Sequence, residues 1–154
     1  MNKKILTIIV SILVMTLSIF GLSKSVIAKE VAYLSASSAN TWLAASVKEM
    51  DAVASANGIN ITEFDAQFDP AKQTAQLQDA IASGKYDGIV LCAIYGVGLI
   101  PDIEAAIAAG IEIVVLNQVV GADLTTSDPQ VDGIAASVLA APYRSGTRHG
   151  NLTV

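Results

Sequence analysis

The chain has 154 residues, and its 14 acidic residues outnumber 9 basic ones to give a net charge of −5. An acidic chain without a basic cluster argues against nucleic acid and anionic membrane surfaces as partners. The single cysteine, Cys92, excludes an internal disulfide. It lies in an apolar run, which favours a small buried side chain over the alternative of a reactive thiol.

The first 28 residues have the three parts of a secretory signal peptide. Lys3 and Lys4 precede an uncharged apolar run from Ile5 to Leu22, and Ala28 occupies the expected cleavage position. The run is about 18 residues long, the lower limit for a membrane span, so a retained anchor is the alternative. Hydroxyl residues inside the run favour cleavage after about Ala28. We therefore predict a signal peptide at residues 1–28 and one exported domain in the rest of the chain.

The exported part alternates strands and helices. Hydrophobic patterns and capping residues predict strands at Val31–Ala36, Ile59–Phe64, Tyr86–Ala93 and Ile111–Leu116. They predict helices at Thr41–Asn57, from Asp69-Pro70 to about Ser83-Gly84, and at about Pro101–Ala109. Beyond these we expect a loop at Asn117–Gln130 with a short edge strand near Leu124–Ser127, and a last helix from Asp132-Gly133 to about Ala141, which Pro142 ends or kinks.

This order predicts an α/β fold. Repeated strand–helix units imply a doubly wound parallel sheet with helices on both faces, here preceded by the signal-peptide helix. Ligands of such sheets bind outside the carboxyl ends of the strands. The loops to consider are therefore Ser35–Asn40, Phe64–Asp69, Ala93–Gly98 and Asn117–Gly121.

Neutral polar and aromatic side chains gather in these loops. Asn40 and Trp42 follow the first strand, where an amide can bind hydroxyls and an indole face suits the C–H face of a sugar ring. The alternative is that Asn40 only caps a helix and Trp42 packs in the core. Asn117 and Gln118 follow the fourth strand and offer donors and acceptors, unless they are ordinary loop residues. Tyr95, after the third strand, is a further candidate.

Other chemistries find little support. Gly96-Val97-Gly98 lacks the third glycine of a dinucleotide fingerprint and follows the third strand instead of the first. The chain has no nucleophile elbow, and Asp69 is better explained as a helix cap than as the partner of Asp65 in an acid–base pair. His149 is the only histidine, which argues against a metal site or a triad. We predict no catalytic, cofactor or metal-binding residue.

Four stretches resemble the N-terminal lobe of periplasmic substrate-binding proteins of sugar ABC transporters, of the ribose-binding type. They are Val31–Trp42, the motif Asp-x-Gln-x-Asp-Pro-Ala-Lys-Gln at Asp65–Gln73, Ile81–Leu91 and Ala108–Asn117. The motif is the most specific of the four, and the resemblance covers nearly all of residues 30–154. It implies a non-enzymatic receptor with two lobes that close on a sugar about a hinge.

The resemblance also implies residue roles and partners. Asn40 and Trp42 match residues that contact the sugar, Tyr95 falls in another contact loop, and Asn117 and Gln118 stand where many members have an Asp-Arg pair. The implied partners are a small sugar or polyol and an inner-membrane permease, and the receptor is expected to act as a monomer in the periplasm. A chemotaxis or sensor-kinase receptor of the same fold is the alternative, followed by a secreted α/β hydrolase.

The chain is about half the length of the family's members. Residues 29–143 correspond to the first lobe, and residues 144–154 to the first hinge crossing, at about Arg144–Gly150, and to the start of a second lobe at Asn151–Val154. The resemblance therefore implies a fragment, which alone is expected to bind ligand poorly.

Overall fold

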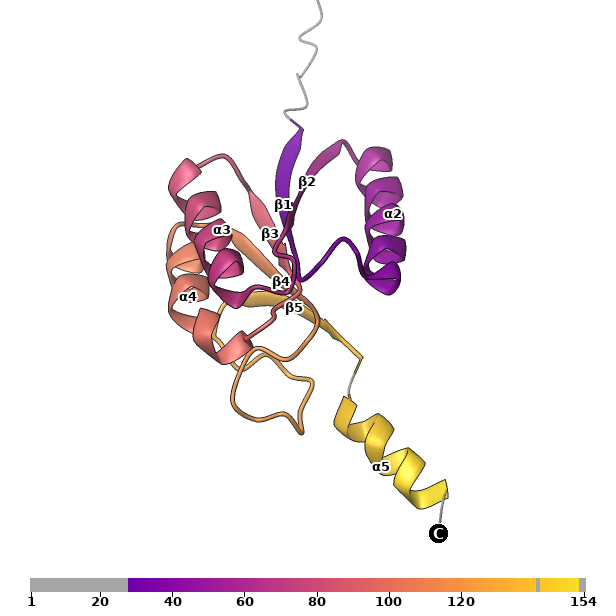
Figure 1. Cartoon of the computed structure of the whole chain (residues 1–154). Coiled ribbons are helices and arrows are strands. Elements are labelled where there is room, and N and C mark those ends of the chain that lie inside the picture. Colours follow the sequence, from indigo (N-terminus) through magenta and orange to yellow (C-terminus); the bar gives the residue numbers. More distant parts are fainter. Residues whose placement is uncertain (1–27, 141, 153–154) are drawn as a thin grey trace, which may run out of the picture.

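The computed structural model describes residues 28–140 and 142–152 and shows a parallel sheet with the strand order β2-β1-β3-β4-β5 (Figure 1). The strands are Lys29–Ser35 (β1), Ile59–Asp65 (β2), Gly88–Leu91 (β3), Glu112–Asn117 (β4) and Ile134–Leu139 (β5). The α-helices are Thr41–Ala56 (α2), Pro70–Ser83 (α3), Ile100–Ala108 (α4) and Pro142–Leu152 (α5), and a short 3₁₀ helix, η1, spans Gly96–Leu99. The predicted signal peptide lies outside the described residues, apart from Ala28.

The first three strand–helix units form as the sequence predicts. Asp69 caps α3 by accepting hydrogen bonds from the backbone N–H groups of Ala71 and Lys72 at 2.8 and 3.1 Å. Pro70 occupies the first turn, where its missing N–H is not needed, and Gly84 ends the helix in the left-handed region with φ 59°. Helix α2 lies on one face of the sheet and α3 and α4 lie on the other (Figure 1). The doubly wound parallel sheet is confirmed.

The two faces bury different amounts of apolar surface. The face under α3 and α4 holds the larger core, which includes Leu34, Leu77, Ile89, Leu91, Ile103, Ile113 and Val115. The face under α2 holds a smaller cluster of buried residues, Tyr33, Ala36, Leu43 and Cys92. Because α2 packs beside β2, this face is left partly open over β4 and β5, where Leu116 is half-buried and its register partner Val138 is exposed.

The last strand corrects the sequence prediction. Residues expected to form a helix from Asp132-Gly133 form β5, which pairs in parallel with β4 from Ile113 to Asn117. Gly133 is no helix start: its φ is 89°, and a β-carbon there would lie 2.8 Å from Cγ2 of Ile107. No strand forms at Leu124–Ser127. The connection from β4 to β5 is instead a loop that the core side chains Val120 and Val131 hold in place.

The segment after β5 is also different from the expectation. Pro142 begins helix α5 instead of ending a helix, which agrees with the tolerance of proline in a first turn. The predicted hinge crossing at about Arg144–Gly150 lies within α5, which extends away from the sheet (Figure 1). The strand expected from Asn151 is absent, since Asn151 and Leu152 are helical, and residues 153–154 lie outside the described range.

Candidate functional site

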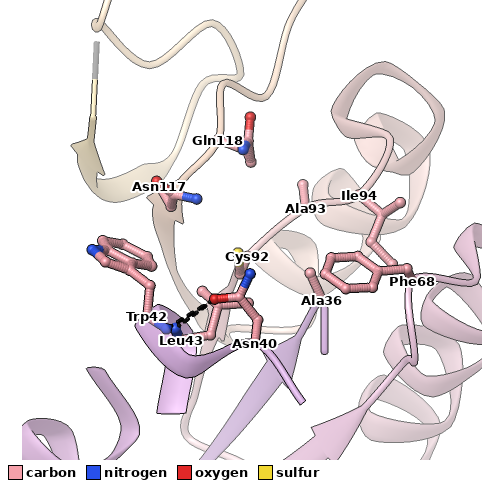
Figure 2. Close-up of a pocket in the computed structure, with 10 residues that line it drawn as sticks. All are labelled: Ala36, Asn40, Trp42, Leu43, Phe68, Cys92, Ala93, Ile94, Asn117 and Gln118. Atoms are coloured by element: carbon pink, nitrogen blue, oxygen red, sulfur yellow. Dashed lines mark hydrogen bonds between the residues drawn. The ribbon is translucent and has the colours of Figure 1, made fainter. Parts of the chain in front are cut away.

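A pocket of about 460 Å³ opens at the carboxyl ends of the strands (Figure 2). Its walls come from the loops after β1, β2, β3 and β4, so segments far apart in the sequence meet there. The lining residues are Ala36, Asn40, Trp42, Leu43, Phe68, Cys92, Ala93, Ile94, Asn117 and Gln118. Four of the five candidate residues from the sequence, Asn40, Trp42, Asn117 and Gln118, therefore border one pocket.

Asn40 is both a helix cap and a pocket residue. Its side-chain oxygen accepts hydrogen bonds from the backbone N–H groups of Trp42 and Leu43 at 3.0 and 3.1 Å, which satisfies two free donors at the start of α2. The amide –NH₂ is directed toward the interior of the pocket (Figure 2). Capping thus fixes the side chain and leaves a donor group for a ligand.

Trp42 is not a core residue. Its side chain is 53% exposed and lies on the side of the pocket opposite Phe68 (Figure 2). Phe68, which sequence reasoning missed, is 58% exposed. Two accessible aromatic rings facing one concave site are able to contact the apolar faces of a flat ligand.

The loop that carries Phe68 is held in an unusual backbone conformation. Gln67 and Phe68 have φ values of 56° and 59°, a region that residues other than glycine rarely adopt. The N–H of Phe68 donates to the carbonyl of Ala36 at 2.7 Å, and the N–H of Gln67 donates to Oδ1 of Asp65 at 2.8 Å. Strain of this kind persists only where surrounding contacts determine it, and it is concentrated at binding sites. In the sequence, the only indication that Phe68 could line a site was the position of its loop after a strand.

Asp65 joins the first two loops. Its carboxylate accepts hydrogen bonds from the backbone N–H groups of Gln67 and Ser38, at 2.8 and 3.2 Å. The bond from Gln67 contributes most to lowering the pKa of Asp65 below its ordinary value, and the bond from Ser38 adds to it. The carboxylate is therefore ionised at neutral pH and holds the loops instead of lining the pocket.

A buried amide holds the third loop. Gln73 on α3 is fully buried, donates from Nε2 to the carbonyl of Cys92 at 2.9 Å, and accepts at Oε1 from the N–H of Ile94 at 2.9 Å. The side chain thus continues the hydrogen-bonding pattern of β3 beyond its end. This gives the final residue of the Asp65–Gln73 motif a structural role: it positions the floor of the pocket.

Asn117 ends β4 in a turn that places its side chain at the pocket. Its φ is 68°, and the N–H of Gln118 donates to the carbonyl of Leu116 at 2.8 Å. A residue with positive φ whose two neighbours are joined by a hydrogen bond, as Leu116 and Gln118 are here, is typical of a strained three-residue turn. The Asn117 amide lies close enough to the Cys92 thiol to interact with it.

The chemistry of the pocket is neutral. None of its lining side chains is charged. Burial raises the pKa of the Cys92 thiol, and hydrogen bonds involving Ala36 and Asn117 offset only part of that effect, so the thiol is protonated at neutral pH. The pocket thus offers amides, aromatic rings and an inert thiol, a set suited to holding a neutral polar molecule.

Tyr95 is not among the residues that line this pocket. It lines a neighbouring hollow of about 290 Å³, to which Ala93, Ile94 and Gln118 also contribute. Sequence reasoning had grouped Tyr95 with the other four residues, whereas in the structure Tyr95 shares a hollow with Gln118 only and not with Asn40, Trp42 or Asn117.

Two further findings concern the described residues only. Within 28–140 and 142–152, no three His, Cys, Asp or Glu side chains come together in a way that could hold a metal ion. In the same part of the chain, no helix has the length and apolar character needed to cross a membrane.

The fold and the pocket together define a class of protein: an α/β lobe with an uncharged pocket at the carboxyl ends of its strands, where ligands of such folds bind. Residues 31–151 match the family described as the periplasmic binding protein domain, and the chain belongs to that family. The resemblance found in the sequence is thereby confirmed. Members of this family are solute-binding proteins.

Solved structures with the same fold include a myo-inositol binding protein and solute binding proteins of ABC transporters. A myo-inositol binding protein from Caulobacter, bound to myo-inositol, has 17% identity and a TM-score of 0.70 over 87% of this chain and 42% of its own. An ABC transporter solute binding protein from Mycobacterium smegmatis, with bound glycerol, has 26% identity and a TM-score of 0.58 over 71% of this chain and 34% of its own.

A periplasmic ribose ABC transporter protein from Conexibacter woesei has 23% identity and a TM-score of 0.57 over 62% of this chain and 32% of its own. The chain thus spans between about a third and two fifths of the length of these structures. A search of curated protein sequences gave no match.

Proposed function

We propose that this chain is the first lobe of a periplasmic receptor that binds a small neutral sugar or polyol and delivers it to an ABC-transporter permease in the inner membrane. The receptor is exported with cleavage after about Ala28 and acts as a monomer without a cofactor. The observation that carries the proposal is the uncharged pocket, in which Asn40 and Asn117 present amides beside the exposed ring of Trp42. Amides bind hydroxyls by directional hydrogen bonds, and an indole face packs on the C–H groups of a sugar ring.

The related structures support this ligand class. Three of them are described as a myo-inositol binding protein, a solute binding protein with bound glycerol, and a ribose ABC transporter protein. Binding by this chain alone is expected to be weak, in the millimolar range, because a single lobe leaves one side of a sugar in water. Small-molecule sites typically bury about 70–90% or more of the ligand's surface, and a single lobe is expected to bury less.

The proposal is tested by titrating the protein with D-ribose, D-glucose, D-galactose and myo-inositol while recording the fluorescence of Trp42, the only tryptophan in the chain. Two-dimensional NMR spectra at high ligand concentration serve as a second readout. At least one neutral compound is expected to change both signals. Glucose 6-phosphate and gluconate, the matched charged compounds, are expected to bind less well, because the pocket has no cation to pair with them. Equal or tighter binding of the anions, or no response to any compound, would contradict the proposal.

A further inference from the structure

A second hollow adjoins the candidate sugar pocket. It has a volume of about 290 Å³ and lies between η1 and the loop that follows β4. Ala93, Ile94 and Gln118 border both hollows, so the two are direct neighbours at these residues. Small-molecule sites typically have volumes of about 300–1,000 Å³, and the two hollows together fall well inside that range.

Exposed apolar side chains are concentrated at the two hollows. The described residues contain seven large hydrophobic side chains that are exposed, and five of them line one of the two. Trp42 and Phe68 line the first, and Tyr95, Val97 and Leu124 line the second, where Tyr95 is 60% and Leu124 62% exposed. Apolar side chains gathered around a concave site on a lobe's surface mark a binding surface.

Two glycines build the wall that carries Tyr95. A β-carbon at Gly98 would overlap the Tyr95 ring, and a β-carbon at Gly96 would overlap the carbonyl oxygen of Val119. Gly98 therefore lets the ring lie against η1, and Gly96 lets η1 approach the loop after β4. The Gly96-Val97-Gly98 sequence, which is too short for a phosphate loop, has a role here in shaping the second hollow.

The lining of the second hollow differs in kind from that of the first. Gln118 is its only side-chain amide, and the other side chains are aliphatic or belong to Tyr95. A hydroxyl-rich sugar would find few side-chain hydrogen-bond partners on such a surface. A flat group that is largely apolar would bury the Tyr95 ring and the Val97 and Leu124 side chains instead.

From these observations we infer that the ligand of this receptor is a glycoside. Its sugar occupies the first pocket, and an apolar ring attached through the glycosidic bond passes Gln118 and stacks on Tyr95 in the second hollow. This inference rests on the proposed function, because the sugar must occupy the first pocket. It adds to that function a ligand class, a sugar linked to an apolar ring, and assigns the second hollow as the subsite for the ring.

The test compares D-glucose, D-galactose and D-ribose with their phenyl glycosides, of both anomers, by two-dimensional NMR titration of the full chain. The parent sugars are expected to shift signals of residues that line the first pocket, such as Trp42 and Asn117, and not those of Gly96–Leu99 or Leu124. At least one phenyl glycoside is expected to shift signals of Gly96–Leu99 and Leu124 as well, and to bind about five-fold more tightly than its parent, the effect expected of one favourable aromatic contact. Tyr95→Ala is expected to abolish this gain and to leave the affinity for the parent sugar unchanged.

Phe68→Ala is the matched control, since it removes an equally exposed aromatic ring from the first pocket. It is expected to lower the affinity for parent and glycoside by the same factor. The inference is overturned if no phenyl glycoside binds more tightly than its parent, if the gain survives Tyr95→Ala, or if phenol alone shifts the Gly96–Leu99 signals with the affinity of the glycoside. These outcomes leave the proposed function intact as long as a parent sugar shifts the Trp42 signals, whereas no shift by any compound would reject both.

Discussion

The sheet face under α3 and α4 is closed, whereas the face under α2 is covered over only part of its width. Ile103, Leu77 and Ile113 on the closed face are fully buried in one continuous core. On the other face, a hollow of about 390 Å³ lies between α2 and the sheet, lined by Met50, Val53 and neighbouring apolar side chains.

The difference separates the part of the sheet that provides stability from the part to which the proposed function assigns ligand binding. Burial of apolar surface, the dominant favourable term in folding, is concentrated on the closed face. The pocket with Leu43, Cys92 and Trp42 opens beside the partly covered face, where exposed side chains remain available to a ligand. Mutations on the two sides are therefore expected to have different consequences.

The largest effect is expected from Leu77→Ala on the closed face. Leu77 is fully buried, so its truncation leaves a closed cavity and should lower the free energy of unfolding by about 2–5 kcal/mol. Leu43→Ala is the matched change on the α2 side. Leu43 borders a pocket open to solvent, so Leu43→Ala should lower the free energy of unfolding by an amount at or below the lower end of that range. Urea unfolding measures both, and equal losses would contradict the distinction between the faces.

The next effect concerns the residue that joins the closed face to the pocket. Gln73→Leu leaves the carbonyl of Cys92 and the N–H of Ile94 without their side-chain partner. The bond to Cys92 is buried, so its loss should cost about 1–3 kcal/mol, whereas the bond to Ile94 is only partly buried and its loss should cost less. Gln78→Leu, on the exposed side of the same helix, should change stability by less than about 0.5 kcal/mol. Thermal unfolding of the two variants, compared with the parent, decides whether the buried amide has this role.

A functional effect without a stability effect is expected on the open side. Trp42→Ala should weaken binding of a sugar that the parent protein binds by more than ten-fold, equivalent to about 1.4 kcal/mol. Because the ring is more than half exposed, the unfolding free energy should change little. NMR titration measures the affinity, and normal binding by Trp42→Ala would exclude a stacking role for the indole.

The smallest effect is expected from acid. The pKa of Asp65 is lowered in the folded protein, mainly by the hydrogen bond from the Gln67 N–H, so the folded state favours the carboxylate. This contribution is complete above the ordinary carboxyl pKa of about 4 and is lost as the pH falls through the lowered value. Asp65→Asn should therefore make stability less dependent on pH below about pH 4 than it is in the parent protein. Thermal unfolding measured between neutral and acidic pH provides the comparison.

Much of the fold follows from local signals. Asp69, Pro70 and Gly84 define α3 by capping chemistry, and the apolar runs define the first four strands. The segment Ile134–Leu139 was predicted wrongly because it contains alanines and has no clear alternation, both of which favour helix. Pairing with β4 overrides that local preference, and nothing within the segment reports the pairing.

The candidate site was predictable in position but not in composition. Since parallel strands end at one edge, Asn40, Trp42, Asn117 and Gln118 could be grouped from the order of the elements alone. Phe68 could not be assigned, because its exposure depends on the left-handed backbone at Gln67 and Phe68. Tyr95 follows the third strand, as the order of the elements indicates, but its position in the second hollow instead of the first pocket depends on how Gly96 and Gly98 let η1 pack.

Strand β5 has one further consequence, for the behaviour of the protein in concentrated solution. In the sheet formed by the described residues, β5 has a neighbouring strand on one side only, and the sequence Ile134–Leu139 contains no charged residue and no proline. The opposite edge strand, β2, carries Glu63 and Asp65, whose charges discourage another chain from pairing there. Aggregation is therefore expected to start at β5. The substitution Ala135→Lys, at an exposed position, would place a charge on this edge strand and reduce aggregation.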